Sequence, residues 1–325
     1  MKTTSIKNFS LWCDFIERGF LQNEFETLIK DARFVGATSN PSIFANAILH
    51  SSAYKDQIAQ CKSQNLAPKG IYEALAIEDI KFAAQMLQGL YEADKDYGYI
   101  SIEIDPTLCD DAKASIDEGK RLFETIEHEN VMIKVPATKA GYEVMGALFA
   151  EGINVNATLI FSQDQARECA KIFDKNAKTN ARAVISVFVS RFDSAISDIA
   201  MPPRLGVLNA MACYDIIESF KNPNIRTLFA STGAKLAGLT PDFYITNLIA
   251  PHSVNTAPLA TIDAFLHSSR ERAIEWMSAK DALNEIGKMN VGGQTLEGLQ
   301  KRLFDDGVVA FKNAFGELLK ALAVV

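Results

Sequence analysis

Residues 131–162 read VMIKVPATKAGYEVMGALFAEGINVNATLIFS, and this stretch decides the fold. Two short runs rich in β-branched residues, VMIKVPA and INVNATLIFS, enclose a longer segment with helical spacing. The second run alternates apolar residues with three polar ones, Asn154, Asn156 and Thr158, as a strand with two distinct faces does. A strand–helix–strand unit of this kind predicts two parallel strands of one sheet.

The same alternation of a strand-like run and a helical segment recurs along the whole chain. Helical segments fall at 71–90, 110–128, 163–175 and 203–220. Strands that alternate with helices form parallel sheets, and eight such units predict a (β/α)₈ TIM barrel. The eight strand-like runs are LWCDF, FVGATS, YISIEID, VMIKVPA, INVNATLIFS, AVISVFVS, RTLFAST and FYITNLI.

Three segments exceed a minimal barrel. They are an insertion at 42–98, an extra helix pair at 191–220, and a helical tail after Pro258. The tail ends in an apolar stripe that we expect to pack across the barrel, although a dimer partner would suit it equally; its residues are Phe311, Phe315, Leu318, Leu319 and Leu322. Without repeats or low-complexity linkers, the chain is predicted to form one domain over 1–325.

Composition narrows the function classes. The 325 residues carry 33 Lys and Arg against 40 Asp and Glu, a net charge of −7, without the basic block of a nucleic-acid binder. The start lacks an apolar run of signal-peptide length, and the longest uncharged stretch, 243–262, is interrupted by prolines. We therefore expect a cytoplasmic protein without membrane segments. Its five widely spaced cysteines predict reduced core thiols: Cys13, Cys61, Cys109, Cys169 and Cys213.

Several strands place charged groups on the predicted inner face. Lys134 lies opposite the apolar face of VMIKVPA, and burial there favours its neutral, nucleophilic amine. Glu103 occupies the corresponding face of YISIEID, and Asp14 ends the first strand. Asp105, before Pro106, is more typical of a turn or helix cap. An amine and carboxylates from different strands of one barrel indicate the active site of an enzyme. Two structural alternatives remain: a purely structural, ion-paired role for Lys134, and a hydrogen-bonded core network for the polar strand residues.

The sequence lacks the motifs of metal-dependent, nucleotide-binding and serine-hydrolase chemistry. The four histidines (His50, His128, His252 and His267) show no HxH or HExxH spacing, so we expect no metal site. The sequence contains no GxGxxG, GxxxxGK[ST] or GxSxG motif of dinucleotide-binding proteins, NTPases or hydrolases. We expect no cofactor.

Two segments carry a family resemblance: GATSNPSIF at 36–44 and VMIKVPATKAGYEV at 131–144. Both resemble signature segments of the transaldolase family, and the likeness extends through INVNATLIFS and SVFVSR to ASTGAK, closest to the longer bacterial branch. It implies a class I aldolase-like barrel that needs no cofactor. A lysine would form a Schiff base and transfer a dihydroxyacetone unit from sedoheptulose 7-phosphate or fructose 6-phosphate to glyceraldehyde 3-phosphate or erythrose 4-phosphate. This reaction belongs to the non-oxidative pentose phosphate pathway (pentose shunt) of carbohydrate metabolism.

The resemblance also implies the catalytic roles. Lys134 matches the Schiff-base lysine, whose iminium accepts the electron pair of the breaking C3–C4 bond. Asp14 matches the base that takes the proton of the C4 hydroxyl group. Glu103 and Thr158 match a pair that holds a water molecule and passes protons during imine formation.

Substrate-binding residues follow from the same resemblance. Asn40, Asn156 and Ser186 match positions that hold the hydroxyl groups of the three-carbon unit, although Asn40 alone would suit a turn before Pro41. Phe188 favours transfer of the three-carbon unit to an acceptor over its release as dihydroxyacetone. Arg191, Ser231 and Lys235 are expected at the phosphate. The family carries an arginine two residues after the serine, where this chain has Gly233, so Lys235 is assigned by charge.

Two other functions remain open. A fructose-6-phosphate aldolase would release dihydroxyacetone, but such relatives are shorter and carry a tyrosine at the Glu103 position. A phosphosugar-binding barrel without catalysis would not need a buried lysine beside two acids. The expected partners are small-molecule sugar phosphates, and a second copy in a homodimer is an open alternative.

Overall fold

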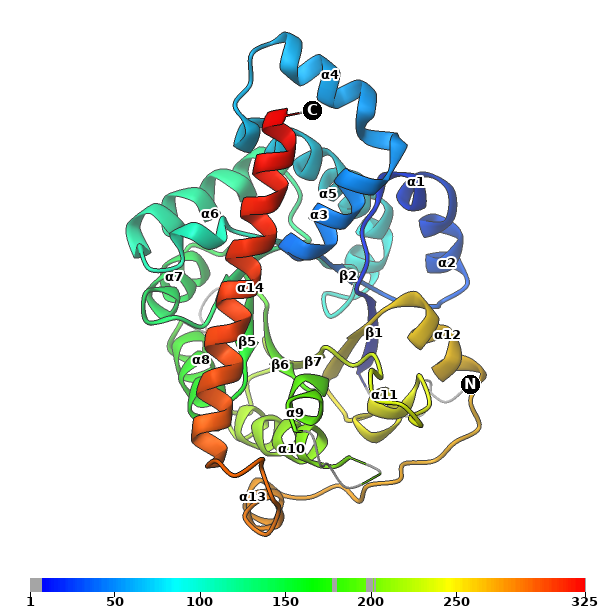
Figure 1. Ribbon diagram of the computed structural model, residues 1–325, viewed down its shortest axis with the longest axis vertical. Coiled ribbons are helices and arrows are strands. Elements are labelled where there is room, and N and C mark those ends of the chain that lie inside the picture. Colours follow the sequence, from blue (N-terminus) through cyan, green and yellow to red (C-terminus); the bar gives the residue numbers. More distant parts are fainter. Residues whose placement is uncertain (1–7, 177–179, 197–200, 202, 325) are drawn as a thin grey trace.

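The computed structural model describes residues 8–324, apart from 177–179, 197–200 and 202. Residues 1–7, part of the stretch that argued against a signal peptide, lie outside the described residues. Eight parallel strands close into a barrel in chain order (Figure 1). The predicted TIM-barrel architecture is confirmed. The strands are β1 Phe9–Cys13, β2 Ala37–Thr38, β3 Ile100–Glu103, β4 Val131–Pro136, β5 Asn154–Ile160, β6 Ala183–Phe188, β7 Ile225–Ala230 and β8 Ser253–Ala257.

The eighth strand is not where the sequence pattern put it. Most of FYITNLI forms a short helix, α11 (Phe243–Asn247), and the strand that closes the barrel is SVNTA. All five residues of α11 are buried, so their aromatic and β-branched character reflects burial rather than extended backbone. A short apolar run cannot be assigned to a strand or a buried helix by its period alone. The prediction for 243–249 was therefore wrong.

Helices surround the barrel and follow most strands. The four predicted helical segments correspond to α5, α6, α8 and α10. Outside the insertion and the tail, the helices are α11 and α1 Arg18–Phe20, α2 Glu26–Lys30, α6 Ala112–Ile126, α7 Lys139–Ala150, α8 Gln163–Lys175, α9 Ser190–Ser194 and α10 Leu205–Glu218. A π-helical turn lies at Leu21–Phe25 between α1 and α2, and a 3₁₀ turn, η4, lies at Pro106–Leu108. Asp105 caps η4 by accepting a hydrogen bond from the Thr107 amide at 2.8 Å, which confirms its predicted role.

The predicted additions are helical. The insertion contains α3 (Pro41–His50), α4 (Lys55–Ser63) and the long α5 (Pro68–Ala93), with a 3₁₀ turn at Ser52–Tyr54. The tail contains α12 (Leu259–His267), α13 (Ala279–Ile286) and the 29-residue α14 (Leu296–Val324). Figure 1 shows α14 crossing the barrel from α13 to the neighbourhood of α4. It contacts α3, α5, α9 and β5, so the tail packs across the barrel as predicted.

The apolar stripe of α14 is used within the chain itself. Phe311, Phe315, Leu318 and Leu322 are buried, and Leu319 is partly buried. All five cysteines are likewise buried and free, as the prediction of core thiols required.

Register across neighbouring strands gathers polar residues in one layer of the barrel. Glu103 of β3 is paired with Lys134 of β4, which is paired with Asn156 of β5. Paired residues of parallel strands project to the same side, so these three side chains share the lumen. The register then shifts between Ala157 and Ile160, where Leu159 takes a left-handed φ of 61°. Such irregularities re-aim side chains at the rim of a barrel.

Arg226 fills the amino-terminal end of the same lumen. It shares one face of β7 with Leu228 and Ala230, which lie higher in the barrel. Its Nη atoms donate to the carbonyl oxygens of Asp96, Asn8 and Ser253 and to the Ser10 hydroxyl, at 2.7–2.9 Å. These bonds tie β7 to β1 and β8 and close the barrel floor.

Candidate active site

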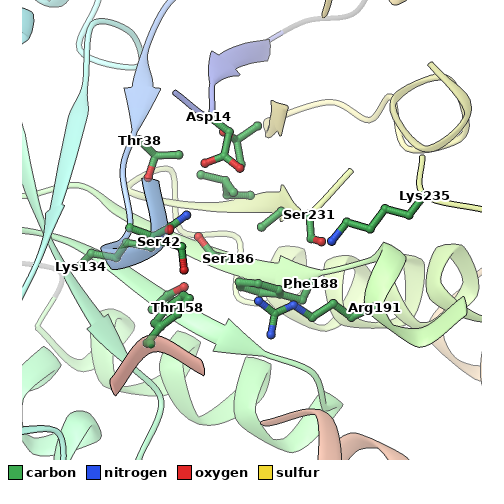
Figure 2. A pocket seen from close by; sticks show the side chains of 15 residues that line it. Asp14, Thr38, Ser42, Lys134, Thr158, Ser186, Phe188, Arg191, Ser231 and Lys235 are labelled. Atoms are coloured by element: carbon green, nitrogen blue, oxygen red, sulfur yellow. The ribbon is translucent and has the colours of Figure 1, made fainter. Parts of the chain in front are cut away.

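A cavity of about 190 Å³ opens at the carboxyl end of the barrel strands. Figure 2 shows side chains from several strands and loops converging on it. Nine of the eleven predicted site residues line the cavity, and Glu103 and Asn156 lie just behind it. The lining residues are Asp14, Thr38, Asn40, Ser42, Lys134, Thr158, Ser186, Phe188, Arg191, Leu228, Ala230, Ser231, Lys235, Thr256 and Phe311.

Lys134 presents its amine to this cavity from β4. The side chain is 6% exposed, and Nζ donates to the Ser39 carbonyl oxygen at 3.0 Å. Nζ also lies 3.7 Å from Oε2 of Glu103, so the lysine is ion-paired, as the structural alternative proposed. That pair borders a cavity rather than a sealed core, which leaves the amine accessible to a ligand.

Glu103 is a buried acid with unused hydrogen-bonding capacity. Burial raises its pKa to about 7, although the nearby Lys134 ammonium group opposes this rise. Among the described residues, neither carboxylate oxygen has a hydrogen-bond partner, and neither does the hydroxyl group of Thr158. Glu103 and Thr158 thus flank Lys134 from the two adjacent strands, and Glu103 can exchange a proton near neutral pH.

Asp14 follows β1 directly, and its amide donates to the Ala257 carbonyl oxygen of β8 at 2.9 Å. This bond fixes the aspartate where the two strands end. Burial raises the pKa of its carboxyl group, and the positive charges of Lys134 and Lys235 oppose that rise. Figure 2 shows Asp14 between the Lys134 end and the Lys235 end of the cavity. It can therefore act on the middle of a long ligand.

The polar face of β5 divides into structural and site residues. Asn154 donates to the carbonyl oxygens of Glu129 and Val131 and accepts from the Arg182 amide, so the core-network alternative holds for it. Asn156 donates to the Ser101 hydroxyl at 3.0 Å and accepts from Ser186 at 2.6 Å. One N–H and the oxygen of its amide are thus used inside the barrel, and it orients Ser186, whose side chain reaches the cavity.

Asn40 combines the two roles that its sequence position suggested. Its Oδ1 accepts from the Ile43 amide at 3.0 Å and caps α3, with Pro41 as the first helical residue. The same side chain lines the cavity. Because Oδ1 serves the cap, Nδ2 is the atom that can donate to a ligand.

The far end of the cavity is cationic. Arg191 and Lys235 both line it, and the Arg191 guanidinium group lies 4.9 Å from the centre of the Phe188 ring. Burial and the neighbouring Arg191 lower the pKa of Lys235, and burial lowers that of Arg191. Ser231, in a left-handed conformation with φ 56°, shares a 3.0 Å hydroxyl contact with Ser190. Two confined cations that repel each other favour an anionic ligand.

Several lining residues escaped the sequence analysis. Thr38 and Ser42 lie inside the GATSNPSIF segment. Thr38 ends the strand of that segment and Ser42 lies in the first turn of the helix capped by Asn40, and these positions are the signal that could have identified them. Thr256 was missed because β8 was misplaced. Phe311 was seen only as part of an apolar stripe, and its place beside Lys134 depends on where α14 crosses the barrel.

Within residues 8–324, apart from the three gaps, no group of three or more histidine, cysteine or acidic residues is arranged to hold a metal ion. None of the helices in this part of the chain combines the length and apolar character of a membrane span.

Comparison with known proteins agrees with this geometry. The family model described as "Transaldolase/Fructose-6-phosphate aldolase" matches residues 11–322. The chain belongs to this family. It is 47% identical to a transaldolase of Helicobacter pylori (strain ATCC 700392 / 26695) over 97% of this chain and all of that protein. It is also 47% identical to a transaldolase of Campylobacter jejuni (strain 81-176) over 98% of this chain and all of the relative. The predicted family and the prediction of a transaldolase-type transferase are confirmed.

Proposed function

We propose that this chain transfers a dihydroxyacetone unit between sugar phosphates through a Schiff base on Lys134. The observation that carries the proposal is one cavity with an amine at one end, two cations at the other, and an acid between them. A phosphate bound by Arg191 and Lys235 would direct the sugar chain toward Lys134, and Asp14 would face its middle. Full-length similarity to transaldolases supports the same reaction.

Imine formation begins when Glu103 takes a proton from the Lys134 ammonium group and the neutral amine attacks the C2 carbonyl carbon of a ketose phosphate. The resulting carbinolamine loses its hydroxyl group as water once that group is protonated. Glu103, with a pKa raised to about 7, exchanges protons near neutral pH and can supply this proton through a water molecule shared with Thr158. The unpartnered oxygens of both residues suit this role.

Carbon–carbon cleavage follows from the protonated imine. Asp14 takes the proton of the C4 hydroxyl group, C4 becomes the carbonyl of a departing aldose phosphate, and the C3–C4 electron pair moves toward nitrogen. The product on Lys134 is a neutral enamine of dihydroxyacetone. Asn40 and Ser186, which line the cavity, would hold its hydroxyl groups.

Transfer reverses these steps with a new acceptor. Carbon 3 of the enamine attacks the aldehyde carbon of the acceptor, Asp14 returns its proton to the new hydroxyl group, and water hydrolyses the imine. Fructose 6-phosphate or sedoheptulose 7-phosphate would be the donor, and erythrose 4-phosphate or glyceraldehyde 3-phosphate the acceptor. We place this activity in the non-oxidative pentose phosphate pathway and in the cytoplasm, whose reducing conditions suit five free, buried thiols.

A transfer assay tests the proposal. The full-length enzyme is incubated with fructose 6-phosphate and erythrose 4-phosphate, and sugar phosphates are separated by mass. We expect a seven-carbon ketose phosphate together with glyceraldehyde 3-phosphate. Release of dihydroxyacetone without a seven-carbon product would instead identify a fructose-6-phosphate aldolase, the other activity in the family's description. Binding without turnover would indicate a phosphosugar-binding barrel.

A further inference from the structure

Phe311 is the residue through which the carboxyl-terminal helix enters the active-site cavity. Its side chain is 4% exposed and lines the cavity. The centre of its ring lies 5.9 Å from Nζ of Lys134. An apolar ring therefore borders the nitrogen on which the proposed imine forms, and it comes from outside the barrel strands.

The neighbouring turns of α14 hold this ring in place. Toward the carboxyl end, the Phe315 ring packs edge-on against Tyr72 at 5.1 Å between centroids, and Tyr72 packs against Phe44 of α3 at 5.9 Å. Toward the amino end, Gly307 lets α14 approach the barrel closely. A Cβ atom there would lie 3.0 Å from Leu159 Cδ2 and 3.2 Å from Arg191 Nη1.

A polar anchor fixes the first turns of the same helix. Gln300 donates to the side-chain oxygens of Gln163 and Asn209, both at 3.0 Å. Asn209 in turn donates to the Phe161 carbonyl oxygen, just beyond β5. The helix is thus tied to the barrel on both sides of Phe311, which gives the ring a defined position over the site.

The enamine on Lys134 can react in two ways, and an apolar ring beside it would affect which one occurs. Attack by C3 on an acceptor aldehyde gives transfer. Protonation of C3 by solvent instead returns the imine, and one water molecule then hydrolyses it to dihydroxyacetone and the free amine of Lys134. Transfer competes with release only where water has little access to the enamine.

We propose that Phe311 determines the outcome of this competition, because its apolar bulk shields the Lys134 enamine from water and so favours transfer over release. This inference rests on the proposed Schiff-base chemistry. It assigns to α14 a specificity-determining function in addition to its packing.

The test measures the ratio of seven-carbon product to released dihydroxyacetone in the full-length enzyme. Phe311→Ala opens space beside Lys134, so we expect the ratio to fall by about tenfold, which corresponds to about 1.4 kcal/mol. Phe311→Leu keeps an apolar side chain of similar reach, so we expect a ratio close to that of the unsubstituted enzyme. Leu318→Ala is the matched control, since Leu318 is fully buried on the same helix but does not line the cavity.

Two results would overturn the inference: an unchanged ratio in Phe311→Ala, or an equal fall in Leu318→Ala, which would point to general loosening of α14. If Phe311→Ala does not fold, Phe311→Val replaces it. Its ratio should lie below that of Phe311→Leu, and equal ratios would contradict the proposal. Failure of the proposed function is distinguishable in the unsubstituted enzyme: it would form neither product if the Schiff-base chemistry failed, and dihydroxyacetone alone if the enzyme were an aldolase.

Discussion

Two buried cations stand at opposite ends of one barrel lumen. Arg226, at the amino-terminal end, is 4% exposed and makes four hydrogen bonds that join β7 to its surroundings. Lys134, at the carboxyl end, is similarly buried but has one hydrogen bond and one ion pair, and it borders a cavity. Burial alone does not distinguish a structural cation from a reactive one. The number of bonds already made and access to a cavity do so.

Lys134→Met should produce the largest effect and separate the two cations most clearly. We expect transfer activity to fall by more than about 10⁴-fold, the scale of losing a nucleophile. Stability should change by less than about 1 kcal/mol, because methionine fits a buried position and Glu103 is then neutral. Urea unfolding beside the transfer assay measures both. A strong loss of stability would mean that Lys134 is a structural cation like Arg226.

Glu103→Gln tests the acid that accompanies Lys134. We expect activity to fall by about 10³-fold, within the range for a general acid–base group. The unsubstituted enzyme should show a limb with an apparent pKa near 7 in its kcat/KM profile, which reports the free enzyme, since burial raises the pKa of Glu103 to about 7. The variant should lack that limb. Its persistence would show that another group titrates there.

The carboxyl group of Glu103 should also make the free energy of unfolding depend on pH. Its pKa is higher in the folded protein than in the unfolded chain, so the folded state binds the proton more tightly. This contribution is fully present below pH about 4.5 and is lost as the pH rises through about 7. Unfolding curves at several pH values should show a smaller decline in Glu103→Gln. Identical pH dependence in both proteins would contradict this view.

Arg226→Met should have the opposite effect to Lys134→Met: it should lower stability and leave activity nearly unchanged. It removes the donor for three backbone carbonyl groups, so we expect a loss of about 3 kcal/mol in the free energy of unfolding. Activity per folded molecule should stay near that of the unsubstituted enzyme, because Arg226 lies away from the cavity lining. A folded, stable variant with strongly reduced turnover would reverse our assignment.

Lys235→Ala should give the smallest effect. It removes one of two cations at the proposed phosphate end, so KM for fructose 6-phosphate should rise by about tenfold while kcat changes little. Lys235→Arg, which keeps the charge, is the matched control and should restore most of the affinity. An unchanged KM in Lys235→Ala would show that this lysine does not bind the phosphate.

Much of this site could be predicted because strand alternation is local. The faces of 131–137 and 153–162 placed Lys134 and Thr158 in the lumen, and the family signatures added the ketose-binding residues. The alternation could not separate Asn154, whose bonds are all structural, from Thr158 on the same face. Hydrogen-bond partners come from other strands, so their presence depends on tertiary structure.

The remaining errors have similar physical causes. FYITNLI has a strand's composition but is a helix buried on all sides, and the polar SVNTA closes the barrel because β1 and β7 need a partner there. Phe311 could not be assigned to the site, since a residue more than 170 positions after Lys134 reaches it only through the path of α14. Single-domain organisation and oligomeric state stay predictions.

In the proposed mechanism Lys134, rather than any other cation of the lumen or cavity, carries the substrate. Borohydride reduction in the presence of fructose 6-phosphate, followed by peptide mass spectrometry, tests this role directly. We predict one adduct on the peptide that contains Lys134 and none in Lys134→Met. Lys235 is the sharpest internal rival, because it shares the cavity and its pKa is lowered. An adduct on Lys235, or no adduct on the active enzyme, would contradict the account.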